Sequence, residues 1–244
     1  MINLNQVTKQ FGAGDIALED ITFSIDPGEF VFVIGPSGSG KTTLFRLLIR
    51  DMVPTTGTIH IGQWDIVNLP KNHVPVLRKK IGVVFQDLKL LKERTIFENV
   101  YFPLEVAGIN EREATRRVDE ILEQVGIAQH RNKFPVQLSG GELQRAAIAR
   151  ALAFSPEILL ADEPTGNLDD ATTWEIVKLL QDINAAGTTI IMATHDTGIV
   201  ERLDKRVIKL EKGRLVKDTV KKSRHHEEKH PSASSGQEEE EEKE

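Results

Sequence analysis

The sequence predicts an α/β fold built on a largely parallel β-sheet. Apolar segments of strand length recur along the 244-residue chain, and helical patterns lie between several of them. These segments are continuous rather than alternating in polarity, which is typical of strands buried on both faces. They cover residues 29–35, 81–85, 157–162, 188–194 and 205–210. Two opening segments, 2–7 and 18–25, alternate in polarity instead and predict an N-terminal antiparallel β subdomain.

Helical patterns dominate the long stretch from residue 86 to residue 157, which contains no clear strand. Asn110 and Glu113 predict a helix start with a reciprocating acid at its third position. The apolar stripe of that helix is formed by Ala114, Val118, Ile121, Leu122 and Val125. A second, alanine-rich helix is predicted over residues 141–153. We therefore expect an α-helical subdomain, about residues 87–156, inserted between two core strands.

The length of the chain fits one large domain with a subdomain, and we expect this domain to span residues 1–220. Residues 221–244 are polar and low in complexity, which predicts a disordered tail. The last seven residues carry six Glu and one Lys, so the rest of the chain is close to neutral. A near-neutral body lacks the basic excess that is typical of proteins binding nucleic acid.

Composition also bears on location. Cysteine is absent, which excludes disulfides and thiolate metal sites. No apolar run approaches the ~20 residues of a membrane-spanning helix, and the N-terminus lacks the pattern of a secretory signal. We expect a cytoplasmic protein.

A glycine-rich segment at residues 35–42, GPSGSGKT, matches the pattern of a phosphate-binding loop. It follows an apolar strand and opens a helix, so main-chain N–H groups and the positive end of the helix dipole can face an anion. Lys41 is expected to reach the β- and γ-phosphates, and Thr42 to bind Mg²⁺. The expected phosphate-contacting residues are Gly35, Pro36, Ser37, Gly38, Ser39, Gly40, Lys41, Thr42 and Thr43. The pattern therefore predicts that the chain binds and hydrolyses Mg-ATP.

Two adjacent acids, Asp162 and Glu163, end the apolar segment 157–162. Parallel α/β sheets bind ligands beyond the carboxyl ends of their strands. If this strand lies beside the strand that ends at residue 34, Asp162 falls near Mg²⁺. Glu163 then falls near the γ-phosphate, where it can orient or deprotonate the attacking water.

Gln86 and His195 also end predicted strands, at the same edge of the sheet. Both can therefore reach the γ-phosphate, the attacking water or the metal, and Gln86 is a further candidate metal ligand. The predicted catalytic set is Glu163, His195, Gln86 and Lys41, and the predicted metal ligands are Thr42, Gln86 and Asp162.

A second anion-ready helix start is predicted within LSGGELQR, residues 138–145. One nucleotide needs only one such cradle, so a second one suggests an ATP molecule held by a partner subunit. The alternative is a well-capped helix with Ser139 at its N-cap and no ligand.

Taken in order, the phosphate loop, Gln86, LSGGE, LLADEP, GNLD at 166–169 and His195 resemble the nucleotide-binding domain of ABC ATPases. The resemblance covers about residues 1–218. It implies a P-loop NTPase (RecA-like) core and two copies that dimerise head to tail around two ATP molecules.

The same resemblance implies roles for residues outside the phosphate loop. Ser139, Gly140 and Gly141 of one copy would contact the γ-phosphate held by Lys41 of the other. Asp169 would lie in the loop that crosses the interface, and Phe11 would stack on adenine. Neither subunit would then hold a complete site.

Within this family, residues 74–108 resemble the FtsE group of cell-division ATPases. That likeness implies an integral membrane partner of the FtsX type, received at about residues 87–102, and a peripheral position on the inner face of the cell membrane. The pair would control cell-wall hydrolases. Relatives usually read QDFRLLPDRT where this chain reads QDLKLLKERT at 86–95, and many have Gln where Leu143 stands.

Three other functions are alternatives to this one. The ATPase of a lipoprotein-releasing or macrolide-efflux exporter would share the catalytic residues and differ in its membrane partner. A DNA-repair ATPase with an ABC head would carry a long coiled coil between Gln86 and Ser139, but the sequence has no heptad run there. A pseudo-ATPase scaffold is disfavoured because the predicted catalytic residues are all present.

Overall fold

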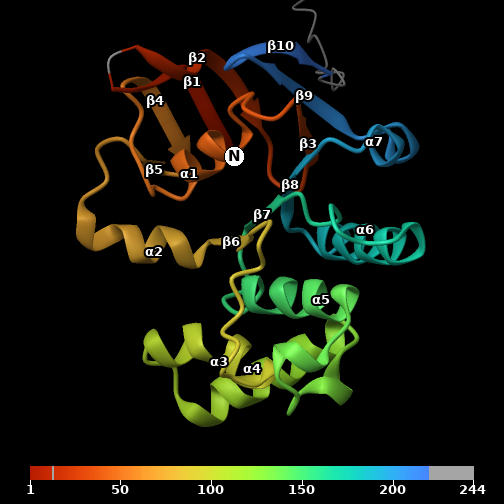
Figure 1. The fold of residues 1–244 in the computed structure, drawn as a ribbon. Coiled ribbons are helices and arrows are strands. Elements are labelled where there is room, and N and C mark those ends of the chain that lie inside the picture. Colours follow the sequence, from red (N-terminus) through yellow and green to blue (C-terminus); the bar gives the residue numbers. More distant parts are fainter. Residues whose placement is uncertain (13, 220–244) are drawn as a thin grey trace, which may run out of the picture.

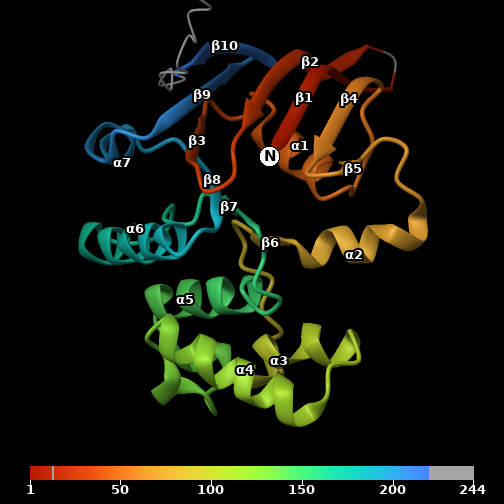
Figure 2. The ribbon, with the colours of Figure 1, turned by 180° about the vertical axis from the view of Figure 1, so that it is seen from behind.

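Two β-sheets and a group of helices make up the computed structural model, which describes residues 1–12 and 14–219 (Figure 1). The antiparallel sheet and the helical subdomain lie at opposite ends of the molecule, with the mostly parallel sheet between them (Figures 1 and 2). The predicted tail, residues 221–244, lies outside the described residues. Among the described residues, no helix combines the length and the apolar character needed to cross a membrane.

The larger sheet has the strand order β10-β9-β3-β8-β7-β6. Its strands are β3 (Phe30–Ile34), β6 (Ile81–Val84), β7 (Ile158–Asp162), β8 (Thr189–Thr194), β9 (Arg206–Glu211) and β10 (Arg214–Asp218). All neighbours are parallel except the hairpin of β9 and β10. The five predicted core strands are confirmed. Strands β3 and β7 do not lie side by side, because β8 pairs with both and separates them.

The smaller sheet is antiparallel, as its alternating polarity predicted, with the order β2-β1-β4-β5. It contains β1 (Ile2–Phe11), β2 (Asp15–Ile25), β4 (Thr56–Ile61) and β5 (Trp64–Asp65). Three short helices lie nearby in the chain: α1 (Lys41–Leu48), a 3₁₀ turn (Lys71–His73) and α2 (Val74–Lys79). The sequence reading missed β4, β5 and β10, which are short or largely exposed strands.

An α-helical subdomain is inserted between β6 and β7. It comprises α3 (Ile96–Val106), α4 (Glu111–Gln124), two 3₁₀ turns (Ala128–His130 and Pro135–Gln137) and α5 (Gly140–Ala151). Asn110 caps α4 as predicted, but its side chain accepts from the N–H of Arg112 and forms no capping box with Glu113. Helices α6 (Asp170–Ala185) and α7 (Thr197–Leu203) follow β7 and β8.

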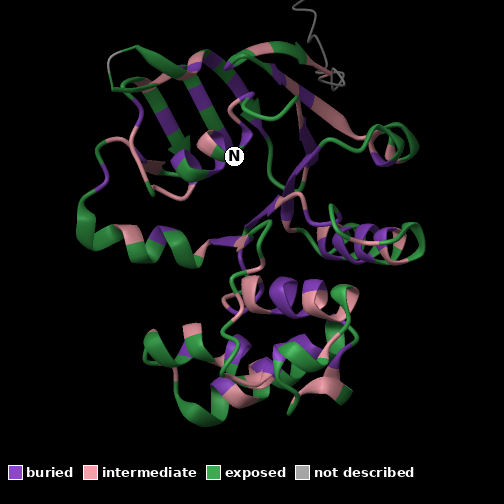
Figure 3. Cartoon of the chain, viewed as in Figure 1, coloured by how far each residue is buried: buried purple, intermediate pink, exposed green. Residues whose placement is uncertain are grey.

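The central strands β3, β7 and β8 are buried on both faces (Figure 3). Alternate side chains of β3 enter two cores: Phe30 and Phe32 pack with the helical subdomain and α6, whereas Val31 and Val33 pack with the antiparallel sheet and α1. Because the sheet packs between two apolar layers, the ends of its strands are held in fixed positions. The loops that leave these ends are therefore suited to positioning a rigid site.

Candidate active site

A cavity of about 600 Å³ opens at the carboxyl ends of β3, β6, β7 and β8. The residues that line it come from the phosphate loop, the start of α1 and the ends of these strands. They are Ala17, Gly35, Ser37, Gly38, Ser39, Gly40, Lys41, Thr42, Thr43, Gln86, Asp162, Glu163 and His195. The structure thus brings together residues that are up to 178 positions apart (Ala17 to His195), including every residue predicted to act in catalysis.

The backbone of the loop needs glycine at the positions where the sequence places it. Gly35, Gly38 and Gly40 have φ values of 153°, 75° and 106°, which L-residues rarely adopt. A Cβ on Gly35 would lie 2.1 Å from the carbonyl oxygen of Leu210, and one on Gly40 would lie 2.7 Å from that of Ala17. The loop therefore needs glycine for two reasons: its backbone has positive φ values, and it packs closely against β2 and β9.

Lys41 is the first residue of α1, and its side chain turns back over the loop. Its Nζ donates to the carbonyl oxygens of Gly35 at 2.8 Å and Pro36 at 3.2 Å. An ammonium has three donors. Two carbonyl contacts fix the position of the charge within the cavity, and Lys41 is buried there.

Thr42 of α1 meets Asp162 at the end of β7, although β3, the strand before the phosphate loop, is not a neighbour of β7. The Thr42 hydroxyl donates to Asp162 Oδ2 at 3.3 Å. Burial raises the pKa of Asp162, and the adjacent Glu163 adds to this effect, whereas the Thr42 hydrogen bond and the Lys41 charge oppose it. The half-buried Asp162 carboxyl, beside the Thr42 hydroxyl, is placed where a bound cation would favour its ionised form.

The donor set suits magnesium rather than a soft metal. Thr42, Gln86 and Asp162 offer oxygen atoms around one region, and all three also line a second, adjoining cavity of about 460 Å³. Across the described residues, no group of three His, Cys, Asp or Glu side chains is placed to hold a metal. Mg²⁺ commonly takes one or two protein ligands together with phosphate oxygens and waters, so the residues present fit it.

Glu163 has a backbone conformation that aims its carboxylate into the cavity. Its φ of 48° lies in the left-handed region, which costs a non-glycine residue on the order of 1–3 kcal/mol. Its N–H donates to the carbonyl oxygen of Ala193 at 3.0 Å, which anchors the turn to β8. Strain of this kind at the end of a buried strand is typical of functional sites.

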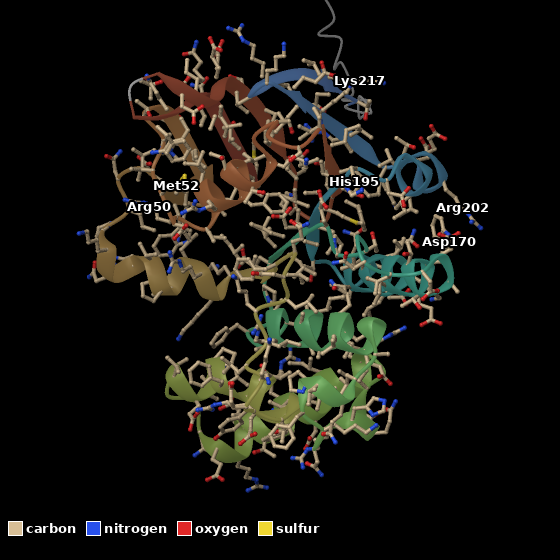
Figure 4. The ribbon with its side chains drawn as sticks, in the orientation of Figure 1. Arg50, Met52, Asp170, His195, Arg202 and Lys217 are labelled. Carbon is tan, nitrogen blue, oxygen red and sulfur yellow. The ribbon has the colours of Figure 1, made fainter. Side chains whose placement is uncertain are left out.

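Two side chains converge on that carboxylate. Gln86 Nε2 lies 3.5 Å and His195 Nδ1 lies 3.3 Å from Glu163 Oε2. The carboxylate is mostly buried, 19% exposed, whereas the imidazole is 67% exposed at the end of β8 (Figure 4). The acid is held within the protein, and the histidine faces outward where a ligand or a second chain can approach.

The remaining predicted residues are not among those that line the cavity. Ser139 caps α5: its hydroxyl accepts from Glu142 N and donates to Glu142 Oε2 at 2.8 Å. The Ser139 N–H also donates to Glu142 Oε2, at 2.7 Å, and this bond, followed by the one from the hydroxyl, lowers the pKa of Glu142. Gly140 and Gly141 form the first turn of α5. The capping that the ligand-free alternative predicted is therefore observed.

Asp169 and Phe11 are placed elsewhere. Asp169 caps α6 through the N–H and hydroxyl of Thr172, at 3.0 and 2.7 Å, and these bonds lower the pKa of Asp169. Phe11 ends β1 with its ring partly exposed, and Lys9 Nζ lies 5.1 Å from the ring centroid. Neither residue contacts the phosphate loop through an interaction that the structure records.

Four residues that line the two cavities are not among the predicted site residues: Ala17, Phe85, Asp87 and Asn167. Ala17 of β2 lines the main cavity because Gly40 packs against it, and Asn167 lines the adjoining cavity. Ala17 carries no polar side chain that sequence reading can recognise. Asn167 lies within GNLD, which was noted only for Asp169.

This arrangement of residues was compared with known proteins. Residues 18–166 match the ABC transporter family, and the matched span includes the phosphate loop, LSGGE and Glu163. The chain belongs to the ABC transporter family. As an ABC ATPase, it binds ATP and hydrolyses it.

Individual relatives agree with this assignment. The chain is 47% identical to the cell division ATP-binding protein FtsE of Streptococcus pneumoniae serotype 2, with 91% of this chain and 96% of that protein covered. It is 51% identical to FtsE of Mycobacterium tuberculosis, covering 89% and 95%. Among solved structures, the ABC cassette MJ0796, as a dimer in a post-hydrolysis state with ADP and Pi, is 37% identical with a TM-score of 0.81. That match covers 89% of this chain and 97% of the cassette.

Proposed function

We propose that this ABC ATPase is the FtsE-like subunit of a membrane complex in cell division, and that it binds Mg-ATP in the 600 Å³ cavity. The observation that supports the site best is the convergence of a glycine loop, a buried lysine and two strand-end acids on one cavity. Loop N–H groups and the Lys41 ammonium would hold the β- and γ-phosphates. Bound Mg²⁺ would neutralise charge that develops on the transferred phosphoryl group, and Thr42, Asp162 and Gln86 would hold it.

Glu163 is the proposed group that orients the attacking water and accepts its proton. The hydrogen bond that Gln86 donates keeps its carboxylate in place, and His195 stands beside both at the open side of the cavity. His195 would donate to the γ-phosphate as its charge grows. During the reaction only the proton and the phosphoryl group would then move, because the side chains that act on them are already in position.

The second half of the site is proposed to come from another copy of the chain. The α5 start at Ser139, Gly140 and Gly141 carries free helix N–H groups suited to a phosphate, yet these residues are absent from the cavity lining. ATP bound at the loop of one subunit would therefore meet the α5 start of its twin. Asp169 would lie at the crossing, and Phe11 would stack on adenine.

A groove on the helical subdomain is the proposed docking place of the membrane partner, an integral protein of the FtsX type. Four large apolar side chains in or next to residues 87–102 are exposed: Phe85, Leu91, Phe102 and Val106. This segment leaves Gln86 directly, so a partner seated there could bias the catalytic glutamine. The ABC ATPase would thereby sit on the inner face of the cell membrane. We infer that residues 1–220 act as one ATPase domain that contains the helical subdomain, about residues 87–156.

Glu163→Gln tests the catalytic assignment and the dimer together. The amide keeps the shape and the contact to Gln86 but cannot take a proton, so ATP binding should persist while phosphate release falls by at least about 10²-fold. Size-exclusion chromatography with Mg-ATP should show a stable dimer. Glu123→Gln, an exposed glutamate of α4, is the matched control and should behave as wild type. An ATP-loaded Glu163→Gln protein that stays monomeric would contradict the shared site.

A further inference from the structure

The start of α5 lies against the loop and helix start that follow β7 in the same subunit. Gly140 and Gly141 open α5, whereas Leu168 and Thr172 belong to the GNLD loop and the first turn of α6. Helices α5 and α6 lie next to each other in both views of the ribbon (Figures 1 and 2). The two segments that are proposed to face the twin subunit are therefore neighbours within each chain.

The contact at Gly141 leaves no room for a side chain. A Cβ at this position would lie 2.4 Å from Thr172 Cγ2, closer than Cβ atoms approach other atoms in proteins. A Cβ on Gly140 would lie 3.3 Å from Leu168 Cδ2, which is tight but tolerable. Gly141 therefore packs its bare Cα surface against the methyl group of Thr172.

Thr172 cannot turn away from Gly141 without losing its other contact. Its hydroxyl donates to Asp169 Oδ2 at 2.7 Å, and its N–H donates to Asp169 Oδ1 at 3.0 Å. A β-branched side chain in a helix has few allowed χ1 states. Rotation that frees the methyl would break the hydroxyl bond to Asp169, so one side chain fixes Gly141 and Asp169 relative to each other.

A second contact lies one turn further along both helices. Arg145 Nη2 of α5 pairs with Glu175 Oε2 of α6 at 2.9 Å, and Arg145 Nη1 donates to the carbonyl oxygen of Val125 at 2.9 Å. The two helices are thus in contact at successive turns, and the arginine also binds the C-terminal end of α4. Displacement of the α5 start must carry the α6 start with it.

We propose that Thr172 is a positioning residue that joins the Ser139–Gly141 helix start to Asp169. The α5 start and Asp169 then form one rigid surface that faces the twin subunit. The proposal rests on the shared nucleotide site proposed above. Thr172 is not among the residues that line the cavity. Its effect is expected on the closing of two subunits over ATP and not on the binding of ATP to one subunit.

The methyl group and the hydroxyl group of Thr172 can be removed separately by substitution. Thr172→Ser deletes the methyl that faces Gly141 and keeps the hydroxyl, whereas Thr172→Val keeps a branched shape and deletes the hydroxyl that binds Asp169. Gly141→Ala introduces the clash. The clash must displace the α5 start, and misplacement of groups at a reacting centre costs up to about 100-fold in rate, so Gly141→Ala should lower kcat by about 10- to 100-fold. The ATP affinity of the isolated subunit should stay within about twofold of wild type.

The decisive variant is Gly141→Ala combined with Thr172→Ser, because the alanine methyl takes the space that the threonine methyl leaves. Its kcat, and its ATP-dependent dimer fraction in a Glu163→Gln background, should return to within about threefold of Thr172→Ser alone. Gly141→Ala combined with Thr172→Val, which keeps the methyl, should not recover. Melting of the nucleotide-free proteins checks that each variant is folded.

Each outcome decides a different point. If the Thr172→Ser combination is as impaired as Gly141→Ala, or if the Thr172→Val combination recovers equally, the packing role of Thr172 is wrong. Unchanged kcat and dimer fraction in both single Thr172 variants would overturn the proposal even if Gly141→Ala fails to fold. If Glu163→Gln with native residues 141 and 172 does not dimerise with ATP, the shared site fails and takes this inference with it.

Discussion

Asn99 holds the backbone of residues 91–95 in place through hydrogen bonds, and these residues belong to the segment proposed to bind the membrane partner. This side chain of α3 is fully buried, 0% exposed, yet it is polar. Its Oδ1 accepts from Leu91 N at 2.7 Å. Its Nδ2 lies 2.9–3.1 Å from the carbonyl oxygens of Thr95, Leu91 and Arg94. Asn99→Ala removes all of these contacts at once.

The loss in folding free energy caused by Asn99→Ala can be worked out from the number of hydrogen bonds that the amide group can make. An amide has one acceptor oxygen and two N–H donors, so the three carbonyl oxygens compete for two protons and the side chain makes about three hydrogen bonds in total. At about 1 kcal/mol each, their loss amounts to about 3 kcal/mol. Leu91 is partly exposed, so water can satisfy some of its backbone groups and reduce the loss to about 2 kcal/mol.

Calorimetric melting of the nucleotide-free protein measures this effect. For a domain of this size, about 2–3 kcal/mol lowers Tm by about 4–12 °C. Hydrogen exchange should also accelerate at the amide of Leu91. Asn68→Ala is the matched control, because this exposed asparagine donates one side-chain bond to Asp65 at 2.7 Å; its stability should change by less than about 0.5 kcal/mol. An Asn99→Ala protein as stable as this control would refute the reasoning.

Two further predictions concern the acid in the cavity and the tail. Burial raises the pKa of Asp162, so the native protein loses stability as the pH rises through that native pKa. Asp162→Asn should therefore raise Tm at neutral pH, with the gain vanishing in acid, and should abolish magnesium-dependent ATPase activity; a lower Tm at neutral pH would contradict the burial argument. Deletion of residues 221–244 should leave the ATPase rate within about twofold, since polar segments of this kind do not contribute to a core; a large loss would show that the tail acts in catalysis.

Local patterns predicted most of the elements and most of the cavity. The continuous apolar run at Phe30–Ile34 is a buried central strand, as such runs usually are. The glycines of the loop occupy backbone conformations that other residues avoid. Signals of this kind depend on a few neighbouring residues and can be read without knowing the fold.

Contacts between distant segments could not be predicted in the same way. Nothing within residues 157–162 indicates that β8 separates β7 from β3, because each strand is compatible with several neighbours. Asn99 is one of several polar residues of α3, and nothing in the helix itself indicates that this side chain binds Leu91 of the preceding loop. The contact between Gly141 and Thr172 joins two segments 31 positions apart, and only coordinates reveal that a methyl group fills the space over the glycine.

The central claim is that ATP held by Lys41 of one subunit is closed over by Ser139 of its twin. Mixing two defective proteins tests it most directly. Lys41→Ala removes the phosphate-binding ammonium, and Ser139→Asp retains a good N-cap for α5 but sets a carboxylate against the triphosphate. Each variant alone should be nearly inactive. A heterodimer of the two contains one composite site with Lys41 from one chain and Ser139 from the other.

ATPase activity of the mixture, measured as phosphate release at constant total protein, should therefore rise well above that of either variant. A mixture no more active than its two components would contradict the shared site and confine catalysis to a single subunit.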